Sequence, residues 1–132
     1  NFVFFRSERS QKLIMSDNKL ERLQKIAIEA VEQSWRLHVP EIVFLDKYDF
    51  SPLIKNQNIF FHTISENSKL IQKTKIDYDN TINLFVWPEW GFSDDEIKKF
   101  KNMFFEQVHL WDRILRTETT WMVTSFYIIQ NR

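Results

Sequence analysis

Two arginines and one glutamate near the end of the chain have the types and spacing that chemistry requires. Arg113, Arg116 and Glu118 follow a short apolar segment and precede a longer one. A guanidinium in such a loop can bind a phosphate or a carboxylate through two parallel hydrogen bonds. The same spacing also allows Arg116 to pair with Glu118 and stabilise the loop. The spacing alone favours neither interpretation.

The other candidates for chemistry are weaker. His38, His62 and His109 lie far apart, one to each segment, which is more typical of solvated or core histidines than of a metal site. Glu8 and Arg9 could form a site pair or an ordinary surface pair, and their spacing alone favours the surface pair. The chain contains no glycine-rich phosphate loop, no HExxH motif and no serine nucleophile elbow. We therefore predict no metal centre.

A strand, a helix and a second strand should position the arginine loop. Residues 82–86 are an apolar run typical of a strand covered on both faces, and Pro88 ends it. Ser93 and Glu96 form a capping box that begins a helix. Its apolar side should contain three residues at helical spacing, Ile97, Phe100 and Phe104. With a strand at 108–111, this predicts a βαβ unit with a right-handed crossover and a ligand crevice at the strands' carboxyl ends.

Strands and helices alternate along the rest of the chain. We expect strands at 2–5 and 59–64, a helix start at 49–52, and a loop at 65–80 with one helical turn near Leu70. The first helix should begin near Asn18 and end near Trp35, and residues 41–45 are of uncertain state. Its apolar face should consist of Leu20, Leu23, Ile26, Ala27, Ala30 and Val31. The apolar segment 121–129 predicts a helix that is buried or packs on a partner subunit.

Composition limits the classes of protein to which the chain can belong. The 132 residues are 43% apolar, enough for one domain with a substantial core. Lysines and arginines balance aspartates and glutamates, so RNA binding would need a local basic patch. Cysteine is absent, which excludes disulfides and cysteine zinc sites. No apolar run reaches the length of a membrane span, and we predict no membrane partner.

Several motifs, in order along nearly the whole chain, resemble those of one family. They include SERS at residues 7–10, QKIAIEA at 24–30, EQS at 32–34, VPE at 39–41, PE at 88–89, GFSDDEI at 91–97 and RILRTET at 113–119. Together they resemble the RsmE family, which consists of SPOUT-superfamily, S-adenosylmethionine-dependent methyltransferases acting on N3 of a uridine in 16S ribosomal RNA.

The resemblance implies a fold, a cofactor and partners. It implies an α/β domain over residues 1–132 with a mostly parallel sheet and a trefoil knot, forming a homodimer through the C-terminal helix. S-adenosyl-L-methionine would lie among three loops of the knot. By motif position the cofactor-binding residues are His62, Trp87, Glu89, Trp90, Gly91, Leu110, Trp111, Ile114, Leu115, Arg116 and Thr117. Arg116 is the catalytic candidate and Arg9 the RNA-binding one. The small ribosomal subunit would be the substrate, and the cytoplasm the location.

The sequence departs from the family pattern in two ways. The family's N-terminal PUA-like RNA-binding domain and the first strand and helix of its methyltransferase domain are expected to be missing, so the sheet would have an exposed edge. Tryptophans replace family glycines at Trp35, Trp87, Trp90 and Trp111, while the whole chain contains one glycine. Glycine permits positive φ and close approach of a ligand, whereas tryptophan opposes both. The pattern resembles glycine codons changed or misread, and the sequence alone does not separate natural decay from an altered sequence or a coding artefact.

Three functions therefore stay open. The first is uridine N3 methylation of 16S rRNA. The second is a catalytically silent homologue, whose pocket is crowded by Trp87, Trp90 and Trp111 and which at most binds RNA or dimerises. The third is a small α/β domain whose helices serve only packing and dimer formation. Binding of S-adenosylmethionine distinguishes the first from the other two.

Overall fold

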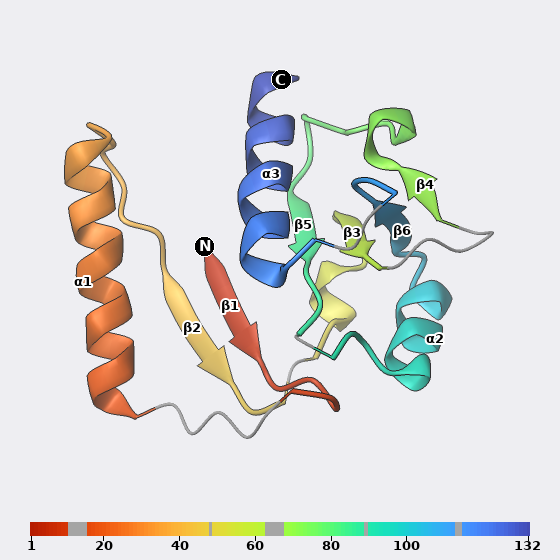
Figure 1. Ribbon diagram of the computed structural model, residues 1–132, viewed down its shortest axis with the longest axis horizontal. Helices are drawn as coiled ribbons and strands as arrows, with labels where there is room; N and C mark the ends of the chain where they lie inside the picture. The colour runs from red at the N-terminus through yellow and green to blue at the C-terminus, as the bar shows by residue number, and fades with distance from the viewer. Residues whose placement is uncertain (11–15, 48, 63–67, 89, 113–114) are drawn as a thin grey trace. The chain divides into compact units, whose positions relative to one another are not determined.

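The computed structural model describes residues 1–10, 16–47, 49–62, 68–88, 90–112 and 115–132. The chain divides into two compact units (Figure 1). The first comprises residues 1–6 and 11–48, and the second comprises residues 7–10 and 49–132. Each unit has a parallel sheet and at least one helix.

The first unit is a strand, a helix and a parallel strand. β1 (Phe2–Phe5) pairs with β2 (Ile42–Leu45) in parallel, with Phe2 opposite Ile42. This confirms the predicted strand at 2–5 and makes the uncertain segment a strand. Between them, α1 (Asp17–Gln33) has Ser16 as its N-cap, slightly before the predicted start. The predicted apolar face is only partly covered. Within the unit Leu20, Leu23, Ala27 and Val31 are half-buried, whereas Ile26 and Ala30 are exposed.

The end of α1 has an unusual residue in a common motif. Backbone N–H groups of Trp35 and Arg36 donate to the carbonyls of Glu32 (3.3 Å) and Val31 (3.1 Å). These two bonds define a Schellman motif, in which Trp35 occupies the position that glycine usually takes. Trp35 accordingly has a φ of 53° and is 93% exposed. The side chain makes the backbone strained and gains no burial in return.

The second unit is built on a four-stranded parallel sheet of order β4-β6-β3-β5 (Figure 1). The strands are β3 (Gln57–Phe61), β4 (Lys69–Leu70), β5 (Ile82–Phe85) and β6 (Glu106–His109). β3 and β6 begin two residues before their predicted starts. β4 was not predicted, because a two-residue strand has too few residues to show periodicity. The helix start predicted at 49–52 is a single 3-10 turn, Ser51–Leu53, and the helical turn predicted near Leu70 is the 3-10 turn Ile71–Lys73.

Two α-helices accompany this sheet. α2 (Asp94–Asn102) begins at the predicted capping box, in which the Ser93 hydroxyl accepts from the Glu96 N–H and the Glu96 carboxylate accepts from the Ser93 N–H. β5, α2 and β6 form the predicted βαβ connection, with β3 lying between the two strands. α3 (Thr117–Gln130) is the predicted apolar helix at the end of the chain.

One side of the sheet packs through phenylalanines. Phe100 of α2 lies within 5.5 Å, centroid to centroid, of five other rings. These rings belong to Phe50, Phe60, Phe85, Phe92 and Phe105, and all are buried. Phe104 was predicted on this apolar side, but that prediction is wrong. α2 ends at Asn102, and Phe104 lies beyond it with a φ of 61° and 90% exposure.

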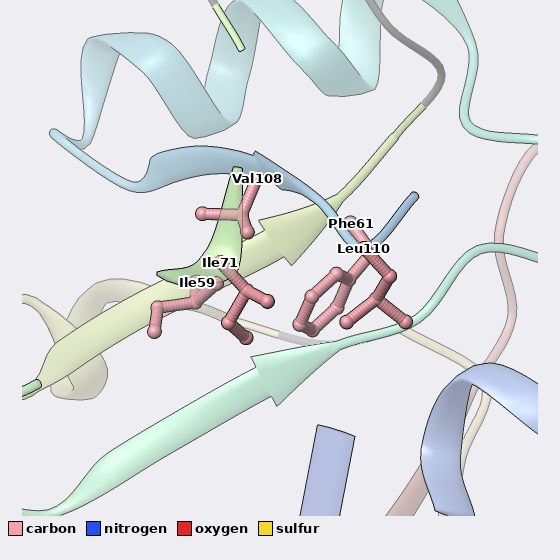
Figure 2. Close-up of a cluster of buried hydrophobic side chains, with 5 residues drawn as sticks. All are labelled: Ile59, Phe61, Ile71, Val108 and Leu110. Carbon is pink, nitrogen blue, oxygen red and sulfur yellow. The ribbon is translucent and has the colours of Figure 1, made fainter. Parts of the chain in front are cut away.

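The other side of the sheet packs mainly through aliphatic side chains, together with Phe61. Ile59 and Phe61 of β3 cluster with Ile71, Val108 and Leu110 (Figure 2). Partly buried residues, including Tyr127 of α3 and Ile82 and Leu84 of β5, pack against this cluster. β3 is therefore covered on both faces, so it positions whatever follows its last residue.

Candidate functional site

Three predicted cofactor loops begin where neighbouring parallel strands end. His62 directly follows β3 and Leu110 directly follows β6, whereas one residue separates Trp87 from the end of β5. Since β6, β3 and β5 are adjacent in the sheet, these loops leave the same edge. The His62 N–H donates to the Val108 carbonyl (3.1 Å), which continues the pairing past the end of β3. The structure thus brings the predicted loops to one edge.

A hydrogen bond and an apolar contact surface join two of these loops. The Thr117 hydroxyl donates to the Trp87 carbonyl at 2.8 Å, across 30 positions of sequence. Trp87 and Leu115 are half-buried and pack against the cluster that contains Leu110. Four predicted cofactor residues therefore share one region, and their backbones are held by β5, β6 and the start of α3.

The other tryptophans of the loops project outward. Trp90 is 68% exposed and Trp111 is 65% exposed, whereas Trp87 packs on the core. Gly91 has a φ of 74°, and its N–H closes a turn to the Pro88 carbonyl at 2.8 Å. Among the described residues, apart from Gly91 itself and its two chain neighbours, no atom lies within 4 Å of where a Cβ on Gly91 would be. The space next to this glycine is open, and of the three tryptophans only Trp87 has its side chain on the shared apolar surface.

Two predicted cofactor residues, Glu89 and Ile114, lie outside the described residues, as does Arg113. Arg116 is described, and its guanidinium pairs with the Glu118 carboxylate at 3.8 Å. Both side chains are mostly exposed, so this pair contributes little stability. The Arg116 carbonyl accepts from the N–H and hydroxyl of Thr120 at 2.8 and 3.0 Å, which helps to start α3. The predicted pairing of Arg116 with Glu118 is present, and a catalytic role for Arg116 stays a prediction.

Sequence reasoning missed the partner of the loop that carries Arg9. The Ser7 hydroxyl donates to the Glu96 carboxylate at 2.9 Å, and the Glu8 N–H donates to its other oxygen at 3.1 Å. Both Ser7 and Glu96 belong to motifs that sequence reasoning had singled out. Their separation of 89 positions left no signal that they meet.

Two cations and one carboxylate act on His62. Burial is the main cause that lowers the pKa of His62 below its usual value, and the charges of Lys101 and Arg9 lower it further. Asp94 acts in the opposite direction. Arg9, predicted to bind RNA, therefore lies within electrostatic reach of a predicted cofactor residue. A separate hollow of about 260 Å³, lined by Lys69, Lys101, Phe105, Glu106 and Gln107, includes the first two residues of β6 and was not predicted.

The fold and these loops are typical of one class of ligand-binding protein. Parallel α/β sheets, with loops gathered at the carboxyl edge, are the architecture of a nucleotide-type ligand site. A family model described as an RNA methyltransferase domain matches residues 1–129. Since the match spans nearly the whole sequence, the chain belongs to that family. Within the described residues, no helix has the length and apolar character needed to cross a membrane.

Individual relatives show which RNA methyltransferases the chain is similar to. Ribosomal RNA small subunit methyltransferase E of Buchnera aphidicola is 35% identical over 126 residues, 92% of this chain and 48% of that protein. Its namesake in Mesomycoplasma hyopneumoniae is 32% identical over 121 residues, 88% of this chain and 51% of that protein. These matches confirm the predicted RsmE resemblance. The chain spans about half the length of these relatives.

Solved structures agree on the fold. A putative methyltransferase from Legionella pneumophila, in complex with the bound cofactor SAM, superposes with a TM-score of 0.77 at 26% identity. The ribosomal RNA small subunit methyltransferase E of Neisseria gonorrhoeae, bound to S-adenosyl methionine, superposes with a TM-score of 0.73 at 25% identity. Each comparison covers 96% of this chain and about half of the other, 53% and 52%. The predicted α/β fold class is confirmed, and the knot stays a prediction.

Proposed function

We propose that residues 1–132 act as the S-adenosylmethionine-dependent methyltransferase domain of an enzyme that methylates N3 of a uridine in 16S ribosomal RNA. The observation that carries this proposal is the joining of the Trp87 and Leu110 loops through the Thr117 hydroxyl at the carboxyl edge of the sheet. The relatives named for this activity, and the two neighbours with the bound cofactor, support the same assignment.

The residues present fit the methyl donor. Its adenosine needs an apolar wall and nearby backbone polar groups, and Trp87, Leu110 and Leu115 supply apolar surface at one edge. The backbone at Gly91 is open to a close approach. With Trp90 and Trp111 mostly in solvent, the crowding expected of three tryptophans is reduced to Trp87. His62, Gly91 and Thr117 complete the described part of the site.

The chain's own contribution to the reaction is orientation and charge. The bound donor supplies an electrophilic methyl group. Pairing fixes β3, β5 and β6, the strands from which the predicted cofactor loops leave, so the described residues at the strand ends can hold the two reactants at a defined distance and angle. Loss of the proton from uridine N3 leaves negative charge on the base. We assign the offsetting of that charge to Arg116, whose guanidinium is exposed and pairs with Glu118 at 3.8 Å.

A second candidate is a catalytically silent homologue, and one observation favours it. Trp87 stands where the family pattern has glycine, and its half-buried ring packs against the same cluster as Leu115. An indole has roughly 150–250 Å² of surface, similar in scale to an adenine, so it occupies space that a glycine leaves free. In this case the chain would at most bind RNA or dimerise.

The proposal includes a homodimer in the cytoplasm, acting on the small ribosomal subunit. Met122, Phe126 and Ile129 are 66%, 66% and 58% exposed, and their spacing places them on one face of α3. Such a continuous apolar face is typical of a helix that packs on a partner subunit.

Calorimetric titration with S-adenosylmethionine tests the proposal, with wild type, Trp87→Gly and Trp35→Gly compared. Trp35→Gly is the matched control, because it also replaces a tryptophan at a family glycine but lies in the first unit. We expect saturable binding by wild type, tighter binding by Trp87→Gly, and no change with Trp35→Gly. Methyl transfer to small ribosomal subunits, followed by mapping of the modified base, then tests the uridine N3 assignment.

Two results would redirect the assignment. Binding by Trp87→Gly but not by wild type would identify a silent homologue with a blocked pocket. No binding by either protein would overturn the cofactor site itself.

A further inference from the structure

One carboxylate holds the loop that carries Arg9. We call residues Ser7–Ser10 the SERS loop. The Ser7 hydroxyl donates to Glu96 Oε2 at 2.9 Å, and the Glu8 N–H donates to Glu96 Oε1 at 3.1 Å. Ser7 is buried and Glu96 is half-buried, so water competes poorly for these bonds. Hydrogen bonds to an ionised carboxylate are also about twice as strong as neutral ones.

The same carboxylate completes the N-terminal cap of α2. Glu96 Oε2 accepts from the Ser93 N–H at 2.8 Å, and the Ser93 hydroxyl accepts from the Glu96 N–H at 3.1 Å. A capping box alone needs one carboxylate oxygen for the N-cap N–H. The bonds from Ser7 and Glu8 are additional to the cap, and they join the SERS loop to the first turn of α2.

The SERS loop is closed on itself around Arg9. Both the hydroxyl and the N–H of Ser10 donate to the Ser7 carbonyl, at 2.7 and 3.1 Å. The backbone on either side of Arg9 is therefore fixed, through Glu8 to Glu96 and through Ser10 to Ser7. Its side chain itself is exposed. Arg9 thus has an ordered base and an exposed side chain whose charge can meet an external anion.

A second cation, Lys101, acts on the same histidine as Arg9. Arg9 and Lys101 both act on His62, which follows β3 in the first predicted cofactor loop. Asp94 partly opposes them. Two cations next to a loop of the candidate methyl-donor site suit an RNA phosphate close to the nucleotide that is modified.

We propose that Glu96 is a positioning residue for RNA binding, because it holds the SERS loop so that Arg9 contacts a backbone phosphate next to the loop after β3. The inference rests on the proposed function, since it takes RNA as the substrate. It adds a role for a glutamate whose position in the sequence indicates only a helix cap.

Three variants separate positioning from capping. Glu96→Gln keeps an oxygen that can complete the cap but loses an acceptor for the SERS loop. Ser7→Ala removes one loop bond and leaves the cap intact. Ser93→Ala is the matched control, since it weakens the cap and leaves both bonds to the SERS loop in place.

Binding of a 16S ribosomal RNA transcript is measured for each variant over a range of salt concentrations. We expect Glu96→Gln and Ser7→Ala to weaken binding several-fold and to lower the salt dependence by about one phosphate contact, as Arg9→Ala should. Ser93→Ala should lower the melting temperature but leave the RNA affinity unchanged. In the Arg9→Ala background, Glu96→Gln should have no further effect. Weaker binding by Glu96→Gln would be informative, because removal of a negative charge by itself would strengthen RNA binding.

Exchange of the Glu8 amide hydrogen gives a second measure that needs no RNA. It should become faster in Glu96→Gln and stay unchanged in Ser93→Ala. If wild type binds RNA and Glu96→Gln binds it equally well, the positioning role is overturned while the proposed function stands. If wild type binds no RNA, the proposed function fails and the RNA role of Glu96 fails with it.

Discussion

The rings of Phe100 and Phe105 stack on each other, with centroids 5.4 Å apart and planes inclined by 9°. Phe100 is in the last part of α2, and Phe105 directly precedes β6. The Phe105 N–H donates to the Phe100 carbonyl at 3.0 Å, and the Phe104 N–H donates to the Lys101 carbonyl at 3.0 Å. These are the two bonds of a Schellman motif, and the stacked rings are its usual apolar contact. Phe104 lies between the end of α2 and Phe105, and its positive φ turns the chain back so that both rings are buried.

Phe104→Gly should therefore stabilise the protein. A left-handed conformation costs a residue with a Cβ roughly 1–2 kcal/mol, part of which is offset by the greater chain entropy of unfolded glycine. Phe104 is 90% exposed, so little burial is lost. We expect a gain of about 1 kcal/mol in the free energy of unfolding, measured by urea denaturation. Phe104→Ala is the control, since alanine keeps the strain. An equal gain in both variants would contradict the backbone explanation.

Trp35→Gly should stabilise the first unit for the same reason. Trp35 has a φ of 53° and is 93% exposed at the end of α1. The expected gain is about 1 kcal/mol, and the Arg36 amide, which closes the motif to Val31, should exchange more slowly with solvent. Slower exchange in Trp35→Ala as well would argue against strain at this position.

The strain at Trp35 also predicts which amino acid the natural protein has at position 35. Its backbone conformation and its family position both favour glycine. We expect peptide mass spectrometry of the protein isolated from its natural source, compared with the gene sequence, to find glycine at position 35. A peptide containing tryptophan there would show that the protein tolerates the strained cap.

The pKa of His62 predicts a pH dependence. Burial, then Lys101 and Arg9, lower this pKa below 6.5 in the folded state, so the unfolded chain binds a proton more readily. The contribution of His62 to stability is therefore fully present above about pH 6.5 and is lost as the pH falls through the lower, folded-state pKa. His62→Gln should flatten the fall in melting temperature on acidification through this range. Unchanged pH dependence in the variant would mean that other groups control it.

The exposed face of α3 predicts an effect on oligomeric state. Phe126→Glu places a charge in the middle of the face formed with Met122 and Ile129. If two copies pack through this face, the variant should be monomeric by light scattering at concentrations where wild type is a dimer, because an unpaired buried charge is costly. Phe104→Glu, another exposed phenylalanine changed to the same residue, is the control and should remain dimeric. A wild-type monomer would contradict the proposed interface.

Sequence patterns predicted the parts of the fold that depend on neighbours along the chain. The capping box of Ser93 and Glu96, the strand at Ile82–Phe85 and the apolar helix at the C-terminus are all present. Motif order also gave the family and the loops of the candidate site. Each of these signals is contained within a few residues, so it can be recognised from the sequence without the rest of the structure.

Tertiary structure decided what depends on residues far apart. Helical spacing placed Phe104 in the core, but the burial of Phe105 against Phe100 ended α2 earlier and turned Phe104 outward. Glu96 indicated only a cap, whereas the fold also gives its carboxylate to Ser7 and Glu8. Trp87, Trp90 and Trp111 looked equivalent in sequence, yet Trp87 packs on the core and the other two are exposed. Local hydrogen bonds and periodicity are encoded within a segment, while burial is settled by which distant segments compete for the same space.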